Sequence, residues 1–346
     1  MLTLYKATQL TKNIAKWGGI GVAGMFLVVL LVRGGNWMIK TFFPTPAPPP
    51  DVQFGKLPPI LFPENATTEQ FTFQLDTVSG GLGNFPDRLK VYKTVPKVPN
   101  LLDLKETRTA AKDTVFKTSE TYVTDTEYFW RDADRFDKKL QVNIVSKDFA
   151  ITSNFLIYPD LNPESVVNQE AALEETTTFL TTFNLFPLDF DENKTTTQLL
   201  SLQGTSVFAA TSLSTAQLIR IDFFQKDLDK IPVTYPHPPN STMHFLMGGK
   251  STDEILEASF MHQEAAREAS TYPIITVAEA YEILKANKGY LASYFGINSA
   301  ISIKDVYLAY YIGEEKQNYI MPVYVFSGKD GFYGYIPAIS SDWIAR

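Results

Sequence analysis

The sequence predicts an α+β protein in which one amino-terminal transmembrane helix is followed by extracytoplasmic domains of helices and antiparallel sheet. Three observations lead to this fold class. Residues 17–32 form an uncharged apolar run, and the segment after it is rich in proline. Near the carboxyl terminus, a helix with a capping signal precedes three strand-like runs joined by short turns. The roughly 295 residues beyond the anchor suit two domains, because domains typically have about 100 to 200 residues.

The apolar run is short for a membrane span, because its helix would reach about 24 Å against a hydrocarbon core of about 30 Å. Trp17 and Trp37 lie twenty positions apart, which would put one indole at each membrane interface. Arg33 would then extend outward from just inside the boundary. We therefore expect a transmembrane helix over residues 17–37, with the lipid bilayer as its partner. The alternatives are a buried core helix and a cleaved signal peptide, but the cleavage pattern of small residues is missing.

Basic residues predict the orientation of this helix. Lys6, Lys12 and Lys16 precede it, against Arg33 and Lys40 after the apolar run. The positive-inside rule then places residues 1–16 in the cytoplasm and the carboxyl-terminal body outside. The expected localisation is the cytoplasmic membrane, with a single pass.

Small residues in the span predict a contact with another membrane helix. Gly19 and Ala23 form a small-xxx-small pair, which lets two helices approach closely. Small residues are also common in membrane helices generally, so composition alone is an alternative explanation. Gly19, Gly21 and Gly24 match a dinucleotide-binding pattern, but that pattern needs a strand before it and a helix after it.

Charge and cysteine content exclude several classes of function. The chain has 31 basic and 38 acidic residues, and its first 50 residues contain five basic and no acidic ones. The remainder therefore has 26 basic (31 − 5) and 38 acidic residues. An acidic body argues against nucleic acid as a partner and against lying flat on anionic lipid. The absence of cysteine excludes thiol catalysis, disulfides and thiolate zinc sites.

Residues 38–63 contain closely spaced prolines and predict an extended spacer, with a Pro-rich recognition motif as the alternative. A first α+β region is expected over residues 64–235. Its strands include an alternating pattern at 71–75 with a partner near 89–91, and its helices span about 101–116 and 163–184. Further strands are expected near 120–130, 139–146, 149–157 and 218–224. Prolines at 232–239 mark the boundary to the second domain.

Residues 236–346 give the clearest pattern. Thr276 and Glu279 form a capping box at the start of a helix, and Gly289 is the expected stop. The runs 301–312, 319–327 and 332–339 follow, separated by short turns. We expect an antiparallel meander packed on the capped helix.

The same segment resembles a known family in its order of apolar and aromatic residues. The helix Ile-Thr-Val-Ala-Glu-Ala-Tyr-Glu-Ile-Leu at 275–284 is followed by Val-Tyr-Leu-Ala-Tyr-Tyr at 306–311 and Met-Pro-Val-Tyr-Val-Phe at 321–326. This resembles PepSY-like modules, and particularly the membrane-anchored bacterial regulators YycH and YycI. The likeness covers the arrangement of a single amino-terminal membrane helix before the folded body, and about the last seventy residues. It implies extracytoplasmic helix-plus-sheet domains and modulation of a sensor kinase through membrane-helix and domain contacts.

Tyrosines concentrate on the expected meander. Tyr307 and Tyr311 share one face of a strand and Tyr310 takes the other, while Tyr324 and Tyr333 lie on the next two runs. We expect one face to pack on the helix. The other is either further core and sheet-surface packing or a surface that recognises another protein, for which tyrosine supplies large contact area at modest entropic cost.

Candidate chemistry is weak elsewhere. Asp189, Asp191 and Asn193 begin like a calcium loop, but the required glycine and the final glutamate are missing. The segment 249–251 resembles the end of a phosphate-binding loop without its first glycine. His237, His244 and His262 have no zinc-enzyme spacing. Asp132, Asp134 and Asp137 suit either a charged hairpin tip or an acid pair for glycoside chemistry.

The sequence therefore predicts no catalytic set, no metal and no cofactor. We expect a single-pass, membrane-anchored extracytoplasmic protein that binds or regulates another membrane or envelope protein. The alternatives are a glycan or peptidoglycan hydrolase that uses acidic residues and a structural subunit of a surface assembly. The oligomeric state does not follow from the sequence.

Overall fold

The computed structural model describes residues 49–65, 69–78, 80–157, 167–249 and 254–345, together with Met25 and Arg33. The chain divides after Pro49 into two units. In the first unit Met25 and Arg33 are helical and exposed, and the predicted positions Trp17, Gly19, Ala23 and Trp37 lie outside the described residues. No helix within the described residues has the length and apolar character needed to cross a membrane.

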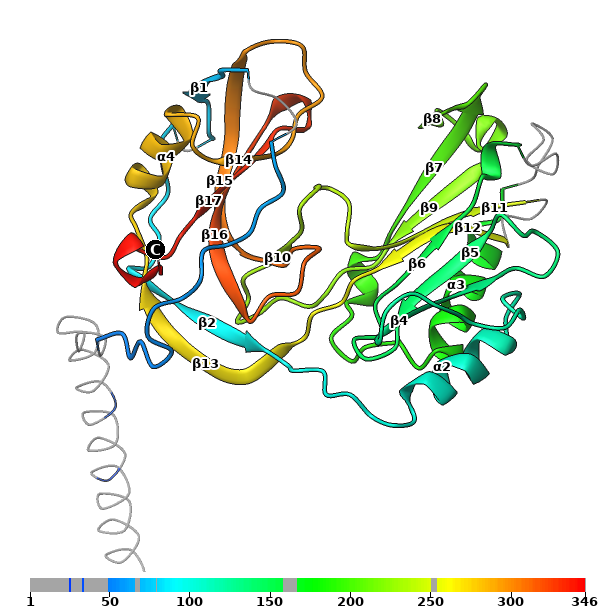
Figure 1. Cartoon of the computed structure of the whole chain (residues 1–346). Helices are drawn as coiled ribbons and strands as arrows, with labels where there is room; N and C mark the ends of the chain where they lie inside the picture. The colour runs from blue at the N-terminus through cyan, green and yellow to red at the C-terminus, as the bar shows by residue number, and fades with distance from the viewer. Residues whose placement is uncertain are drawn as a thin grey trace, which may run out of the picture. The chain divides into compact units, whose positions relative to one another are not determined.

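The second unit has an α+β fold, with two β-sheets and three α-helices among its described residues (Figure 1). One sheet has nine strands in the order β3-β4-β5-β6-β12-β11-β9-β7-β8, and all its neighbours are antiparallel. Its strands are β3 (Thr121–Tyr122), β4 (Glu127–Arg131), β5 (Lys139–Asn143), β6 (Phe149–Thr152), β7 (Thr196–Gln203), β8 (Ser206–Ala209), β9 (Leu218–Asp222), β11 (Met243–Gly248) and β12 (Glu254–Phe260).

Two helices complete the core of the nine-stranded sheet. Helix α2 (Asp103–Lys112) contributes Ala110 and Ala111 to this core, and α3 (Gln169–Thr182) contributes Phe179 and Leu180. Helix α3 packs on β9 and β12. Asn168 caps α3 by accepting the Ala171 N–H at 3.1 Å, so the helix begins later than the predicted residue 163.

The second sheet has eight strands and carries the predicted meander. Its main order is β1-β15-β16-β17-β14, with β10 paired to β15 and with β2 paired to both β13 and β16 (Figure 1). These strands are β1 (Thr72–Leu75), β2 (Arg88–Thr94), β10 (Val233–Thr234), β13 (Ala265–Pro273), β14 (Tyr290–Ser293), β15 (Ala300–Tyr311), β16 (Tyr319–Gly328) and β17 (Tyr333–Pro337). The expected meander β15-β16-β17 is confirmed as antiparallel.

Helix α4 (Val277–Lys285) packs against β17 and β1 of this sheet. Its predicted capping box is confirmed, because the Thr276 hydroxyl accepts the Glu279 N–H and the Glu279 carboxylate accepts the Thr276 N–H. The predicted stop at Gly289 is wrong. The left-handed residue after the helix is Asn287 (φ 55°), a conformation that asparagine tolerates better than most residues.

Two pairings differ from the sequence prediction. β1 pairs in parallel with β15, and not with β2 as expected. Alternation shows which side chains of a strand are buried but does not identify its neighbour. The boundary expected at 235/236 also does not separate the two sheets, since β11 and β12 belong to the nine-stranded sheet, whereas β1 and β2 belong to the other.

The segment before β1 packs on the eight-stranded sheet, although the sequence predicts a spacer there. Leu57 is fully buried and forms a parallel bridge with Ile344, and Asp51 accepts the Thr271 N–H at 2.7 Å. Ile60 and Phe62 pack against a cluster of buried residues on one face of the sheet. The stretch 51–62, which contains a turn closed by the Gly55 N–H and the Val52 carbonyl at 3.0 Å, therefore lies against the body.

Candidate functional site

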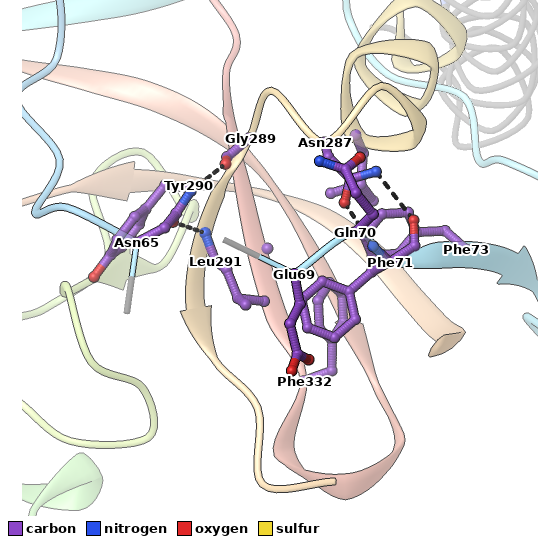
Figure 2. A pocket seen from close by; sticks show the side chains of 12 residues that line it. Asn65, Glu69, Gln70, Phe71, Phe73, Asn287, Gly289, Tyr290, Leu291 and Phe332 are labelled. Atoms are coloured by element: carbon purple, nitrogen blue, oxygen red, sulfur yellow. Dashed lines mark hydrogen bonds between the residues drawn. The ribbon is translucent and has the colours of Figure 1, made fainter. Parts of the chain in front are cut away.

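A cavity of about 360 Å³ opens between the segment before β1 and the stretch that joins α4 to β14 (Figure 2). Its apolar lining consists of Phe71, Phe73, Leu284, Tyr290, Leu291 and Phe332. Its polar lining comes from Asn65, Glu69, Gln70 and Asn287. A hollow of this size that combines apolar rings with several polar groups could hold a small ligand or a side chain.

Asn287 fixes one side of the cavity. Its Oδ1 accepts the Phe71 N–H at 2.9 Å and its Nδ2 donates to the Phe71 carbonyl at 3.0 Å (Figure 2). The amide side chain thus bonds to Phe71 as a neighbouring strand would. Because Asn287 also ends α4, the end of the helix and the start of β1 are held together.

Asn65 makes the equivalent arrangement on the other side. Its Oδ1 accepts the Leu291 N–H at 2.8 Å and its Nδ2 donates to the Gly289 carbonyl at 3.3 Å (Figure 2). Leu291 belongs to β14, which lies at the end of the sheet order. The Asn65 side chain is therefore bonded to backbone groups on the outer edge of that strand.

Glycines allow the close packing around the cavity. A Cβ at Gly289 would lie 2.5 Å from the Ile336 side chain, and one at Gly334 would lie 2.9 Å from the Phe332 ring. Both distances are below normal van der Waals contact.

Tyr290 lines the cavity with a buried ring. Burial raises the pKa of Tyr290 to about 12, so its hydroxyl stays protonated near neutral pH and donates to the Pro236 carbonyl at 3.1 Å.

The five tyrosines that were predicted as a possible partner surface are buried or partly buried in the structure. Tyr310, Tyr311 and Tyr324 are buried, so the prediction that they form a partner surface is wrong for these three. The predicted division of faces is confirmed, because Tyr311 and Tyr307 pack in one cluster and Tyr310 in another. Tyr307 and Tyr333 are partly buried. Phe62 packs edge-on against Tyr311, with ring centroids 4.8 Å apart, and the segment containing Phe62 covers the face that was expected to be open.

The calcium-loop residues point to different partners. Asp189 lies 2.9 Å from His262 Nε2 and accepts the Gln225 side-chain amide at 2.7 Å. Asp191 instead accepts the Asn193 N–H at 3.2 Å at the start of a short 3₁₀ helix. Within the described part of the chain, no group of three or more His, Asp or Glu side chains is placed to hold a metal.

The histidines differ in environment. His237 is exposed and lies 3.9 Å from Glu314, whereas the His262 side chain is 8% exposed. Burial and the Arg220 charge lower the pKa of His244 to about 4, so this imidazole is neutral at physiological pH. The segment 249–251 falls partly outside the described residues, and its phosphate-loop resemblance has no structural test.

The acidic residues at 132–137 stabilise the β4–β5 hairpin. Asp132 Oδ1 accepts the backbone N–H groups of Asp134 and Arg135 at 2.8 and 3.2 Å. Lys138, whose side chain is 2% exposed, lies 3.2 Å from Glu254 and 3.8 Å from Asp132. This arrangement agrees with the charged hairpin tip, with part of the charge buried.

Sequence reasoning missed the cavity. In the sequence, Asn65 belongs to an Asn-Ala-Thr glycosylation pattern, and Asn287 carries no signal beyond its position after a helix. The signal that could have identified Asn287 is that asparagine tolerates left-handed backbone at the end of a helix. Nothing in the sequence indicates that two amides some 220 positions apart line one hollow (Figure 2).

Comparisons with known proteins show similarity to solved structures alone. The chain matches no protein-family model, and no curated protein sequence matches it. Among solved structures, it is similar to an uncharacterized protein from Eubacterium rectale ATCC 33656, whose crystal structure was determined at 1.45 Å resolution. The two share 12% identity with a TM-score of 0.42, over 77% of this chain and 87% of that one.

Proposed function

We propose that this protein is a single-pass, membrane-anchored regulator that binds another membrane or envelope protein outside the cytoplasmic membrane and catalyses no reaction. The observation that carries the proposal is the cavity between Asn65 and Asn287. Its lining combines aromatic and aliphatic side chains with primary amides, groups that bind a ligand by burial and hydrogen bonding.

The anchor comes from the sequence. The apolar run at 17–32, the tryptophans at its two ends and the basic residues before it support a helix with its amino terminus inside. The small residues Gly19 and Ala23 support a second contact inside the membrane. The resemblance of residues 275–326 to PepSY-like modules of the YycH and YycI type agrees with such a regulator.

Crosslinking in native membranes tests the proposal. The full-length chain carries a photoreactive residue at Glu69, on the cavity rim, and crosslinked proteins are recovered and identified. We expect one partner to recur. Gln70→Trp places an indole at the cavity mouth and should abolish the crosslink, whereas Gln74→Trp, on the same segment but outside the cavity lining, should preserve it.

Replacing residues 1–40 by an unrelated membrane anchor separates the contact made by the membrane helix from the contact made by the body. A partner that is lost in this variant but retained by Gln74→Trp binds through the membrane helix as well as the body. Recovery of no recurrent partner, or equal recovery with Gln70→Trp and Gln74→Trp, would contradict the proposed function.

A further inference from the structure

Strand β8 leaves one edge of the nine-stranded sheet unpaired. It lies at the end of the strand order, and among the described residues it pairs with β7 and with no other strand (Figure 1). The Ala210 N–H donates to the Leu199 carbonyl of β7 at 2.9 Å. Because bonded and non-bonded residues alternate along an antiparallel pair, Phe208 also bonds to β7, whereas the N–H and carbonyl groups of Val207 and Ala209 point away from β7.

These outward backbone groups are accessible. All four residues of β8 are exposed, and Val207 and Phe208 are 39% and 49% exposed. Within the part of the chain that the structure describes, no hydrogen bond engages the outward N–H or carbonyl of Val207 or Ala209. The edge of β8 therefore presents free donors and acceptors to the surroundings.

This edge lacks the features that normally keep sheet edges from pairing. Natural proteins protect an edge with charged residues, proline, a bulge or a very short strand. The opposite edge of the same sheet follows that rule, since β3 has only two residues and Glu120 and Asp125 lie beside it in the chain. In β8 the sequence is Ser-Val-Phe-Ala, and its register with β7 is regular. Because valine and phenylalanine also favour strands, β8 is suited to pair with one more strand.

Charge indicates what pairs with this edge. Of the chain's residues, 20% are charged, but residues 195–219, which include β7 and β8, contain no Asp, Glu, Lys or Arg. The charged residues that bound this stretch are paired, Lys194 with Asp227 and Arg220 with Asp222. A strongly charged partner would therefore lose hydration at the hairpin without gaining an ion pair.

A second copy of the chain fits this uncharged surface. Beyond residue 50 the body has 38 acidic against 26 basic residues, so two copies repel each other over most of their surfaces. At the β7–β8 hairpin they approach without like-charge repulsion. An uncharged edge is thus the part of the body where self-association costs least.

Two identical β8 strands are complementary in one antiparallel register. When Val207 of one copy lies opposite Ala209 of the other, the two-fold axis passes beside Phe208. Every outward N–H and carbonyl of Val207 and Ala209 is then hydrogen-bonded to the other copy. Phe208 faces its symmetry mate as a non-bonded pair, in which the Cα atoms lie about 4.5 Å apart and the side chains are close.

We propose that a second copy of this chain adds its β8 to this edge in antiparallel orientation, so that the two nine-stranded sheets become continuous. Phe208 of one copy meets Phe208 of the other at the two-fold axis. The contact uses no residue that lines the cavity between Asn65 and Asn287, so it is independent of the proposed function. Because the shared edge is only four residues long, association should be reversible and dependent on concentration.

A single introduced cysteine tests the register. The chain contains no cysteine, so each variant of the full-length protein in detergent has one thiol, and mild oxidation can join only two copies. Phe208→Cys places the two thiols opposite each other at a Cα spacing that suits a disulfide, and it should give a covalent dimer. Val207→Cys is the matched control. Its Cα lies farther from its symmetry mate than the roughly 7 Å that a disulfide spans, so this variant should stay monomeric.

Charge reversal tests the contact without oxidation. Phe208→Lys and Phe208→Glu each place like charges opposite each other, and each should raise the dissociation constant at least about tenfold in sedimentation of the full-length protein. An equimolar mixture of the two variants brings opposite charges together and should recover the dimer. Phe136→Lys, at the exposed tip of the β4–β5 hairpin, is the control and should leave association unchanged.

The outcomes distinguish this contact from others. Self-association that Phe208→Lys leaves unchanged would place the contact elsewhere, such as at Gly19 and Ala23 in the predicted membrane helix, and would overturn the proposal. Equal disulfide formation by Phe208→Cys and Val207→Cys would overturn it as well. A wild type that stays monomeric at about 100 µM, together with no disulfide in Phe208→Cys, would also show that the occupant is not a second copy.

Discussion

The side-chain amide of Asn287 holds the backbone of Phe71, which lies 216 positions earlier in the chain, through hydrogen bonds of 2.9 and 3.0 Å. Asn287 also has a positive φ of 55° at the end of α4. One residue therefore ends a helix, secures the segment that enters β1 and forms one side of the cavity. The local turn and the long-range contact depend on the same side chain.

Replacing Asn287 should separate these two roles. Asn287→Gly removes the amide but keeps the left-handed backbone, and we expect a loss of about 1 to 2 kcal/mol in the free energy of unfolding. Asn287→Ala also strains the backbone and should cost about 1 kcal/mol more. Urea unfolding of the full-length protein in detergent, followed by tryptophan fluorescence, measures both. Equal stability of the two variants would show that the left-handed backbone at position 287 contributes nothing to the free energy of unfolding.

The buried tyrosines should differ in what their hydroxyl groups contribute. Among the described residues, the Tyr311 hydroxyl has no hydrogen-bond partner, whereas Tyr324 donates to the Ile275 carbonyl at 2.8 Å. Tyr311→Phe should leave stability unchanged or raise it by up to about 1 kcal/mol, and Tyr324→Phe should lower it by about 1 to 2 kcal/mol. Thermal melting of the pair is the measurement, and a larger loss for Tyr311→Phe would contradict the geometry.

Lys138 should be more important for stability than an exposed lysine. Its buried ammonium lies 3.2 Å from Glu254 and 3.8 Å from Asp132. Lys138→Met removes this counter-charge and leaves Glu254 paired with Arg135 at 3.2 Å, so it should cost about 2 to 4 kcal/mol. Lys304→Met is the matched control, because Lys304 pairs with Asp76 at the surface, and it should cost less than about 1 kcal/mol.

A double mutant tests the assignment of the Lys138 effect to charge. Glu254→Gln added to Lys138→Met should restore part of the lost stability in urea unfolding, because it removes a carboxylate that has lost one of its two cationic partners, Lys138 and Arg135. If the two losses simply add, packing rather than charge explains the Lys138 effect.

The capping box of α4 should make stability depend on pH. Hydrogen bonds from the Thr276 backbone N–H and hydroxyl lower the pKa of Glu279 below its usual 4.5. A lowered pKa means that the stabilisation is present above pH 4.5 and is lost as the pH falls through the lower value in the folded protein. Glu279→Gln keeps an acceptor that does not titrate.

Urea midpoints at about pH 5 and about pH 3 measure this effect. The wild type should lose more stability between these two pH values than Glu279→Gln does. Identical pH dependence in the two proteins would show that the box contributes no pH-dependent stability.

The sequence alone determined the local elements that rest on neighbouring residues. The capping box of Thr276 and Glu279, the meander over 300–337 and the alternation of β1 follow from short-range hydrogen bonding and periodicity. These features need no knowledge of distant segments, because capping groups and strand faces lie within a few residues of one another.

Only the tertiary structure decided which segments meet. The partner of β1, the division of strands between the two sheets and the covering of Tyr311 by Phe62 are long-range choices. The cavity depends on them most, because Asn65 and Asn287 gain their roles from backbone groups more than 200 positions away. Periodicity specifies a buried face, and packing of the whole chain decides what covers that face.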